Sequence, residues 1–84
     1  MLNPNTSESM TAEIAAAARA AAAPGTEIVA AKPRFGAAAI DSASESYLSA
    51  VGVMDVVATM VAAGDFDFDA VILAGFGEHG KDAL

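Results

Sequence analysis

The stretch that decides the fold is residues 70–74, Ala-Val-Ile-Leu-Ala, followed directly by residues 75–80, Gly-Phe-Gly-Glu-His-Gly. The first five residues are apolar without alternation, which is typical of a parallel strand covered on both faces. The six residues after them read as a tight glycine-rich loop, and Lys81 begins what reads as the first turn of a helix. A buried strand, a short loop and a helix start indicate one unit of a parallel α/β sheet.

A long helix is predicted upstream of this unit. Ser42 and Glu45 stand at the spacing of a capping box, and the helical pattern ends near Gly64. Gly52 lies inside the pattern and is expected to weaken or bend the helix by about 1 kcal/mol relative to alanine. The expected apolar stripe of this helix is Tyr47, Val51, Met54, Ala58 and Val61.

The N-terminal part of the chain predicts a second helix between two short strand segments. Ser7 is the expected N-cap of this helix, which Pro24-Gly25 should terminate. Residues 26–31 read as a brief strand, and Met1-Leu2 reads as the remnant of another. The expected apolar positions of the helix are Met10, Ile14, Ala17, Ala18 and Ala21.

The order of these elements predicts an α/β fold: a partial three-layer parallel sheet, as in a flavodoxin-like lobe, truncated at both ends. Ligands of such sheets bind outside the carboxyl ends of the strands. The loops that follow the three strand segments are residues 3–7, 32–40 and 75–80, and parallel strands would bring them to one edge. Taken alone, the first loop is also explained as a helix-capping turn.

The composition excludes several function classes. The chain has 84 residues, 55% of them hydrophobic, and Lys and Arg total 4 against 11 Asp and Glu, a formal net charge of −7. Such a surface repels phosphate backbones and acidic lipid headgroups, so no nucleic-acid or membrane partner is expected. The absence of cysteine removes disulfides, thiolate metal sites and thiol nucleophiles. Charged residues interrupt every apolar run, so no membrane-spanning segment is expected. The N-terminus also lacks a basic segment typical of targeting signals, and a cytoplasmic protein is therefore expected.

Three further patterns are candidates for binding or catalytic sites. Gly75, Gly77 and Gly80 match the dinucleotide fingerprint, but its acidic partner would lie beyond Leu84, so the pattern favours a tight strand-to-helix turn. Asp65, Asp67 and Asp69 alternate with phenylalanines, yet the glycine and glutamate of a calcium loop are missing, so no metal is expected. His79 is the one histidine, which cannot form a histidine-based metal cluster.

Five short segments, in this order and spacing, carry a resemblance to a known family. They are Asn3-Pro4-Asn5-Thr6-Ser7, Met10-Thr11 with Ile14, Pro24-Gly25-Thr26-Glu27, Arg34-Phe35-Gly36, and Asp69 through Gly80. Together they resemble the N-terminal part of the aspartate/glutamate/hydantoin racemase family, nearly from end to end of the chain. The resemblance implies that residues 1–84 are the N-terminal portion of the first α/β lobe of a two-lobe, cofactor-independent isomerase.

The chemistry that the resemblance implies is α-proton transfer between two cysteines, one from each lobe, on opposite faces of the substrate Cα. The first cysteine of such relatives follows the strand, and here that position is Gly75. Ala37, Ala39 and His79 also depart from the residues common in the family, namely Pro, Ser and Pro. Because these catalytic cysteines are missing, no catalytic residue is assigned and the chain alone is expected to be inactive.

The resemblance also implies a substrate site and partners. The expected partner is a small molecule, an amino acid or a hydantoin, with no cofactor and no metal, and the full-length protein is a candidate homo-oligomer. Two alternatives stay open: a single-cysteine decarboxylase relative, and a non-catalytic α/β module that binds an anion or nucleotide at the loop 75–80. The expected substrate-binding residues are Asn3, Asn5, Thr6, Gly75, Phe76 and Gly77.

Overall fold

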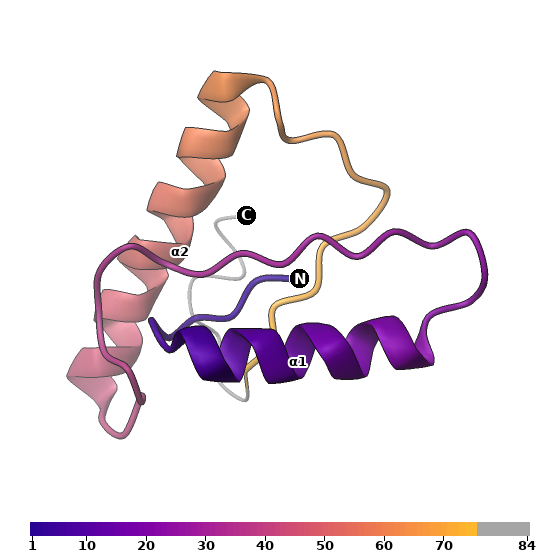
Figure 1. Ribbon diagram of the computed structural model, residues 1–84. Helices are drawn as coiled ribbons and strands as arrows, with labels where there is room; N and C mark the ends of the chain where they lie inside the picture. Colours follow the sequence, from indigo (N-terminus) through magenta and orange to yellow (C-terminus); the bar gives the residue numbers. More distant parts are fainter. Residues whose placement is uncertain (76–84) are drawn as a thin grey trace.

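The computed structural model describes residues 1–75 and contains two helices joined by extended segments (Figure 1). The residues after Gly75 lie outside the described part of the chain. They include Phe76 and Gly77, the dinucleotide-like glycine spacing, His79 and the helix start expected at Lys81.

Helix α1, Glu8–Ala21, begins where the sequence predicts. The Ser7 side chain accepts a hydrogen bond from the Met10 backbone N–H at 3.2 Å, which satisfies one of the free donors of the first turn. The helix stops at Ala21, and Ala22 is already extended, just before the predicted terminator Pro24-Gly25. Of the expected apolar positions, Ala17 and Ala21 are exposed, and Ala15 is the buried residue of this helix.

Helix α2, Ala43–Ala63, confirms both predicted ends. Ser42 accepts from the Glu45 N–H at 3.3 Å, while the Glu45 carboxylate accepts from the Ser42 hydroxyl and from the backbone N–H of Asp41, the residue before the N-cap, both at 3.0 Å. Gly64 takes the left-handed conformation, with φ 75°, and its N–H reaches back to the carbonyls of the last turn. The helix is continuous through Gly52.

The predicted apolar stripe of α2 is wrong about which face is buried. Tyr47 is 75% exposed, Val51 57% and Val61 58%, whereas the buried residues are Ser49, Gly52, Val53 and Val56. These four also recur at helical spacing, but two of them are small. Small residues bury this face because they let the loop after Lys32 approach the helix backbone, and apolar periodicity gives such residues little weight.

Leu2 pairs in parallel with Ala31 on one side and with Leu73 on the other. On the first side Asn3 N–H donates to the Ala31 carbonyl and Ala31 N–H to the Met1 carbonyl, both at 3.0 Å. On the second, Leu2 N–H donates to the Ile72 carbonyl at 2.7 Å and Ala74 N–H to the Leu2 carbonyl at 2.8 Å. The N-terminal segment therefore lies between the segments that follow α1 and α2 (Figure 1).

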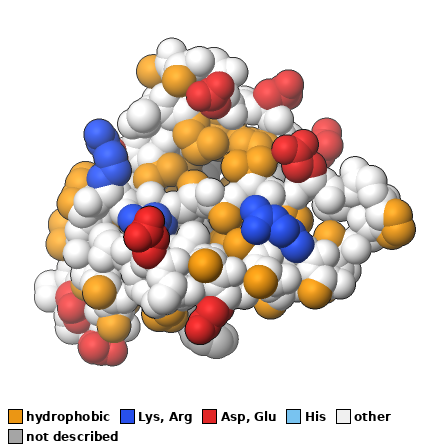
Figure 2. Space-filling view, in the orientation of Figure 1, with side chains coloured by type: hydrophobic (Ala, Val, Ile, Leu, Met, Phe, Trp, Pro, Cys, Tyr) orange, Lys and Arg blue, Asp and Glu red, His pale blue; other side chains and the backbone are white. Residues whose placement is uncertain are grey.

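Within residues 1–75 this pairing consists of isolated bridges rather than strands, which corrects the strands expected at 26–31 and 70–74. Both segments pair only with residues 1–3, and that central segment is too short to support a longer ladder. Val71 and Ile72 are 43% and 59% exposed, so the expectation of a strand covered on both faces is also wrong. Figure 2 shows apolar side chains exposed between scattered acidic ones on one face of the molecule.

The core lies where α2 covers the paired segments. Leu2, Val53 and Val56 are buried in one cluster. The partly buried residues packed against it are Ala31, Val57, Met60 and Leu73. This cluster fixes the position of Leu2, and with it the polar turn that begins at Asn3.

Helix α2 is also long and apolar enough, by length and composition, to cross a membrane. Asp55 lies near its middle and pairs with Arg34 at 2.7 Å, and one face of the helix packs on the loop at Pro33. These contacts bury one face of α2, and 17% of its most apolar stretch is buried in all.

Candidate functional site

A pocket of about 760 Å³ lies at the carboxyl edge of the three paired segments. It gathers the turn after Leu2, the N-terminal turn of α2 with the loop before it, and the end of the segment after Leu73. The lining residues are Asn3, Pro4, Asn5, Met10, Ile14, Ala39, Ile40, Asp41, Ser42, Ala43, Ser46, Ala74 and Gly75. The three loops expected at one edge therefore do contribute to one cavity.

Asn3, Asn5 and Gly75, of the six predicted binding residues, line this pocket, whereas Thr6 does not and Phe76 and Gly77 lie outside the described residues. Asn3 is 1% exposed and Asn5 is 7% exposed. Both are buried polar side chains, so their hydrogen bonds determine what they offer to a ligand.

The side-chain amide of Asn3 forms its hydrogen bonds within the protein. Its Nδ2 donates to the Asn5 Oδ1 and to the Thr11 Oγ1, both at 2.9 Å. Its Oδ1 accepts from the Asn5 backbone N–H at 3.3 Å. Asn3 thus fixes the shape of the turn.

Asn5 is the side chain that keeps a donor toward the pocket. Its Oδ1 accepts from Asn3 Nδ2 and from the Ser7 backbone N–H, the latter at 3.0 Å. Its Nδ2 donates to the Met10 sulfur at 3.6 Å. A thioether is a weak acceptor, so this donor is available to a stronger acceptor on a ligand.

Thr6 joins two of the loops. Its backbone N–H donates to the Ala37 carbonyl at 3.0 Å, and its methyl carbon lies 3.9 Å from the Cβ position of Gly36. The structure therefore places Thr6 behind the pocket wall, where it holds the loop 32–40 against the N-terminal turn.

The N-terminal turn of α2 is a side of the pocket that the site prediction missed. Asp41, Ser42 and Ser46 line it, and the first N–H groups of a helix carry a partial positive charge. The signal was present in the capping box at Ser42 and Glu45, which places a helix start directly after the second loop. Gly75, on the opposite side, donates its N–H to the Leu73 carbonyl at 3.1 Å and presents no side chain.

The lining offers hydrogen-bonding groups and the Asp41 carboxylate, and it has no thiol. Amide, hydroxyl and backbone N–H groups suit a small polar molecule with carbonyl oxygens. Residues 1–75 contain no group of three His, Cys, Asp or Glu side chains able to hold a metal ion, and the chain has no thiol.

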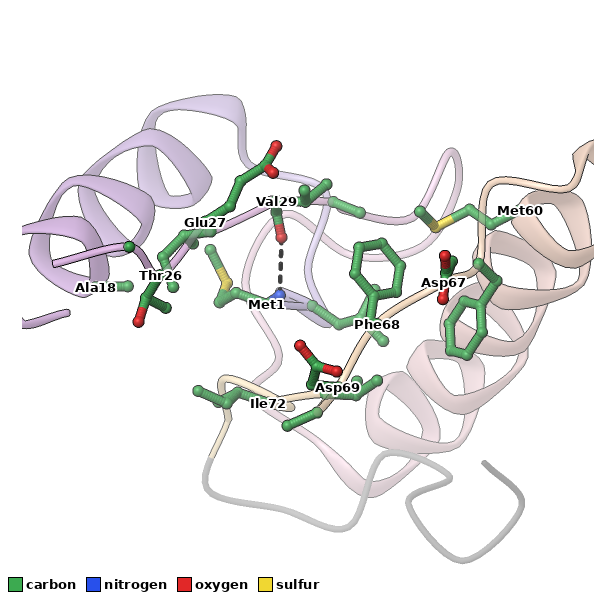
Figure 3. A pocket seen from close by; sticks show the side chains of 17 residues that line it. Met1, Ala18, Thr26, Glu27, Val29, Met60, Asp67, Phe68, Asp69 and Ile72 are labelled. Carbon is green, nitrogen blue, oxygen red and sulfur yellow. Dashed lines mark hydrogen bonds between the residues drawn. The ribbon is translucent and has the colours of Figure 1, made fainter. Parts of the chain in front are cut away.

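A second pocket of about 680 Å³ opens at the other end of the paired segments (Figure 3). The Met1 ammonium donates to the Val29 carbonyl there at 2.8 Å, and burial lowers the pKa of this group. Phe66 and Phe68 meet edge to face, with centroids 5.4 Å apart, and their neighbour Asp67 is exposed. This pocket is mostly apolar and collects none of the predicted site residues.

Comparison with known proteins identifies the family to which this chain is similar. The model of the Asp/Glu/hydantoin racemase family matches residues 1–84. A hydantoin racemase from Pseudomonas sp. (strain NS671) is 39% identical over 83 residues, which are 99% of this chain and 32% of that protein.

Solved structures of two racemases match as well. The allantoin racemase from Klebsiella pneumoniae is 44% identical, with a TM-score of 0.82 over 94% of this chain and 31% of that one. The allantoin racemase from Pseudomonas fluorescens is 53% identical, with a TM-score of 0.85 over 99% of this chain and 34% of that one. The chain therefore spans about a third of the length of these relatives.

Proposed function

The chain belongs to the Asp/Glu/hydantoin racemase family, and from that premise we propose that it forms the substrate-holding part of the first lobe of a cofactor-independent racemase. The proposed substrate class is a hydantoin-like ring or an amino-acid derivative. In the complete lobe, the segments around Ala31, Leu2 and Leu73 form a parallel sheet in that order, as in flavodoxin-like folds.

The observation that carries the proposal is the shared pocket of Asn5, Gly75 and the first turn of α2. A hydantoin or allantoin ring presents one carbonyl oxygen on the atom next to the carbon that loses its proton. Donors aimed at such an oxygen stabilise the negative charge that develops on it as the C–H bond breaks. Asn5 Nδ2 is the donor that this chain supplies, since the Glu45 N–H at the start of α2 already donates to Ser42.

Proton transfer itself requires a group from outside residues 1–75. The resemblance gives the first thiol of the family to the position of Gly75, which has only hydrogen there. A base from the second lobe would remove the α-proton, and inversion then requires the planar intermediate to take a proton on its opposite face, which would come from solvent at the position of Gly75. The chain alone lacks that base and is proposed to be inactive. One acid-base group working from one side is also the arrangement of a single-cysteine decarboxylase relative, which Gly75 favours as the second candidate.

The test is isotope exchange by the protein expressed from its complete native reading frame. Each enantiomer of a 5-substituted hydantoin, and of allantoin, is incubated in D₂O while the α-proton is followed by NMR and the optical rotation by polarimetry. Loss of the α-proton signal with loss of rotation supports a racemase. An arylmalonate that releases CO₂ while the hydantoins stay unchanged supports the decarboxylase instead, and no reaction with any compound contradicts the proposal.

The variant Gly75→Cys sharpens the test because it restores a thiol at the family position. We expect it to raise the exchange rate of the complete protein at least tenfold, because a second acid-base group can then act from the opposite face. Gly75→Ser, of similar size but with a weakly acidic hydroxyl, is the matched control and should leave the rate unchanged.

A further inference from the structure

Thr11 lies on the first turn of α1, behind the pocket, and makes two hydrogen bonds that define its hydroxyl. Oγ1 donates to the Ser7 carbonyl at 2.7 Å, the same carbonyl that accepts the Thr11 backbone N–H at 3.1 Å. Since its one hydrogen is committed there, the hydroxyl can only accept from the other side. It accepts from Asn3 Nδ2 at 2.9 Å.

The hydroxyl of Thr11 thereby selects one orientation of the Asn3 amide. With Nδ2 toward Thr11, the second hydrogen of that group meets Asn5 Oδ1, and the Asn3 oxygen meets the Asn5 N–H. A flipped amide would turn its oxygen toward Asn5 Oδ1 and its donor toward the Asn5 N–H. Three favourable contacts would become repulsive or lost in a site that is nearly closed to water.

The Asn3 amide in turn orients Asn5. Because Asn5 Oδ1 receives Asn3 Nδ2 and the Ser7 N–H together, the Asn5 NH₂ group must face the other way. On that side it meets the Met10 sulfur, at the wall of the pocket.

We propose that Thr11 is a positioning residue which, through Asn3, aims the Asn5 NH₂ group at a carbonyl oxygen of the bound substrate. This inference rests on the proposed function for the identity of the substrate, but the order Thr11, Asn3, Asn5 stands on the hydrogen bonds alone. The proposal gives different roles to two asparagines that the sequence analysis predicts as binding residues. Asn5 contacts the substrate, and Asn3 does not.

The activity test is a double-mutant cycle in the protein from its complete reading frame. Thr11→Val keeps the shape and removes the hydroxyl, and Thr11→Ser keeps the hydroxyl. We expect Thr11→Val to lower kcat/KM about tenfold and Thr11→Ser to stay within about twofold of the parent. In an Asn5→Ala background, Thr11→Val should change kcat/KM less than about twofold, because the group through which it acts is gone.

An equal loss from Thr11→Val with and without Asn5 would overturn the proposal, since it would mean that Thr11 serves only general stability. A Thr11→Val protein with full activity would overturn it as well. Circular dichroism spectra matching the parent establish that each variant is folded.

A second measurement keeps the inference testable if no racemisation is found at all. The side-chain NH₂ protons of Asn3 should exchange slowly with water in the parent protein and in Thr11→Ser, and fast in Thr11→Val, with a shift of the Asn5 NH₂ resonances. Unchanged exchange and shifts in Thr11→Val would refute the positioning role independently of the reaction that the protein catalyses.

Discussion

Replacing Gly52 with alanine should destabilise the protein, although alanine is the better helix former. Gly52 is buried in the middle of α2, and an added Cβ would lie 2.9 Å from the Cβ of Pro33 and 3.1 Å from the Phe35 carbonyl oxygen. Both separations are shorter than ordinary van der Waals contacts, and one of them involves backbone. The helix and the loop 33–36 must therefore move apart.

The magnitude follows from two opposing terms. Alanine in place of glycine inside a helix gains about 1 kcal/mol, while overfilling a packed site costs about 1–3 kcal/mol. The contact with a backbone oxygen places Gly52→Ala in the upper part of that range, so a net loss of about 1–2 kcal/mol in the free energy of unfolding is expected.

Urea unfolding followed by circular dichroism measures this difference. Ala58→Gly, at an exposed position of the same helix, is the matched control and should cost about 1 kcal/mol through helix propensity alone. If Gly52→Ala were as stable as the parent or more so, the loop at Pro33 would not be packed on α2, and the pocket wall that continues from it would be misplaced.

Two further predictions concern the ion pair and the polar turn. Arg34 donates to both Asp55 carboxylate oxygens, at 2.7 and 2.9 Å, and these hydrogen bonds lower the pKa of Asp55 below its ordinary 3.8. A lowered carboxyl pKa contributes stability that is complete above the ordinary value and is lost as the pH falls through the folded one. The urea midpoint should therefore fall more steeply below pH 3.8 in the parent than in Asp55→Asn, and equal slopes would contradict the pairing. Asn3→Leu should cost about 1–3 kcal/mol of unfolding free energy, because it leaves the buried Asn5 N–H without its acceptor, whereas the exposed control Ser9→Ala should stay within about 0.5 kcal/mol in the same assay.

The helix ends could be predicted from the sequence because their causes are local. Ser7, Ser42 and Gly64 each act within one helical turn, and the structure places all of them where capping rules put them. The order of the elements also predicts that Leu2 pairs in parallel with its neighbours. The structure shows this pairing as isolated bridges to Ala31 and Leu73.

The buried face of α2 could not be predicted in the same way. Gly52 is buried by the close approach of the loop at Pro33 and Phe35, and that contact is not a property of the helix sequence. Apolar periodicity selected Tyr47 and Val61 instead, which the structure leaves exposed. The strand expected at residues 70–74 likewise depends on its neighbour, because only residues 1–3 pair with it.

The sequence predicts that several of the expected binding residues lie together, and that they bind a substrate stays a prediction. Parallel topology alone brings Asn3, Asn5 and Gly75 to one edge, and they line one pocket. The different tasks of Asn3 and Asn5, and the part of Thr11, follow from the direction of single hydrogen bonds, which residue types do not encode.

The most direct test of the account is the position of a bound hydantoin or allantoin in a crystal structure of the complete protein. The account predicts a ring in the polar pocket, with one carbonyl oxygen within hydrogen-bond distance of Asn5 Nδ2 and the ring carbon that exchanges its proton facing Gly75. A ligand seated instead among Phe66, Phe68 and Met1, or one that leaves Asn5 bonded only to Met10, would contradict it.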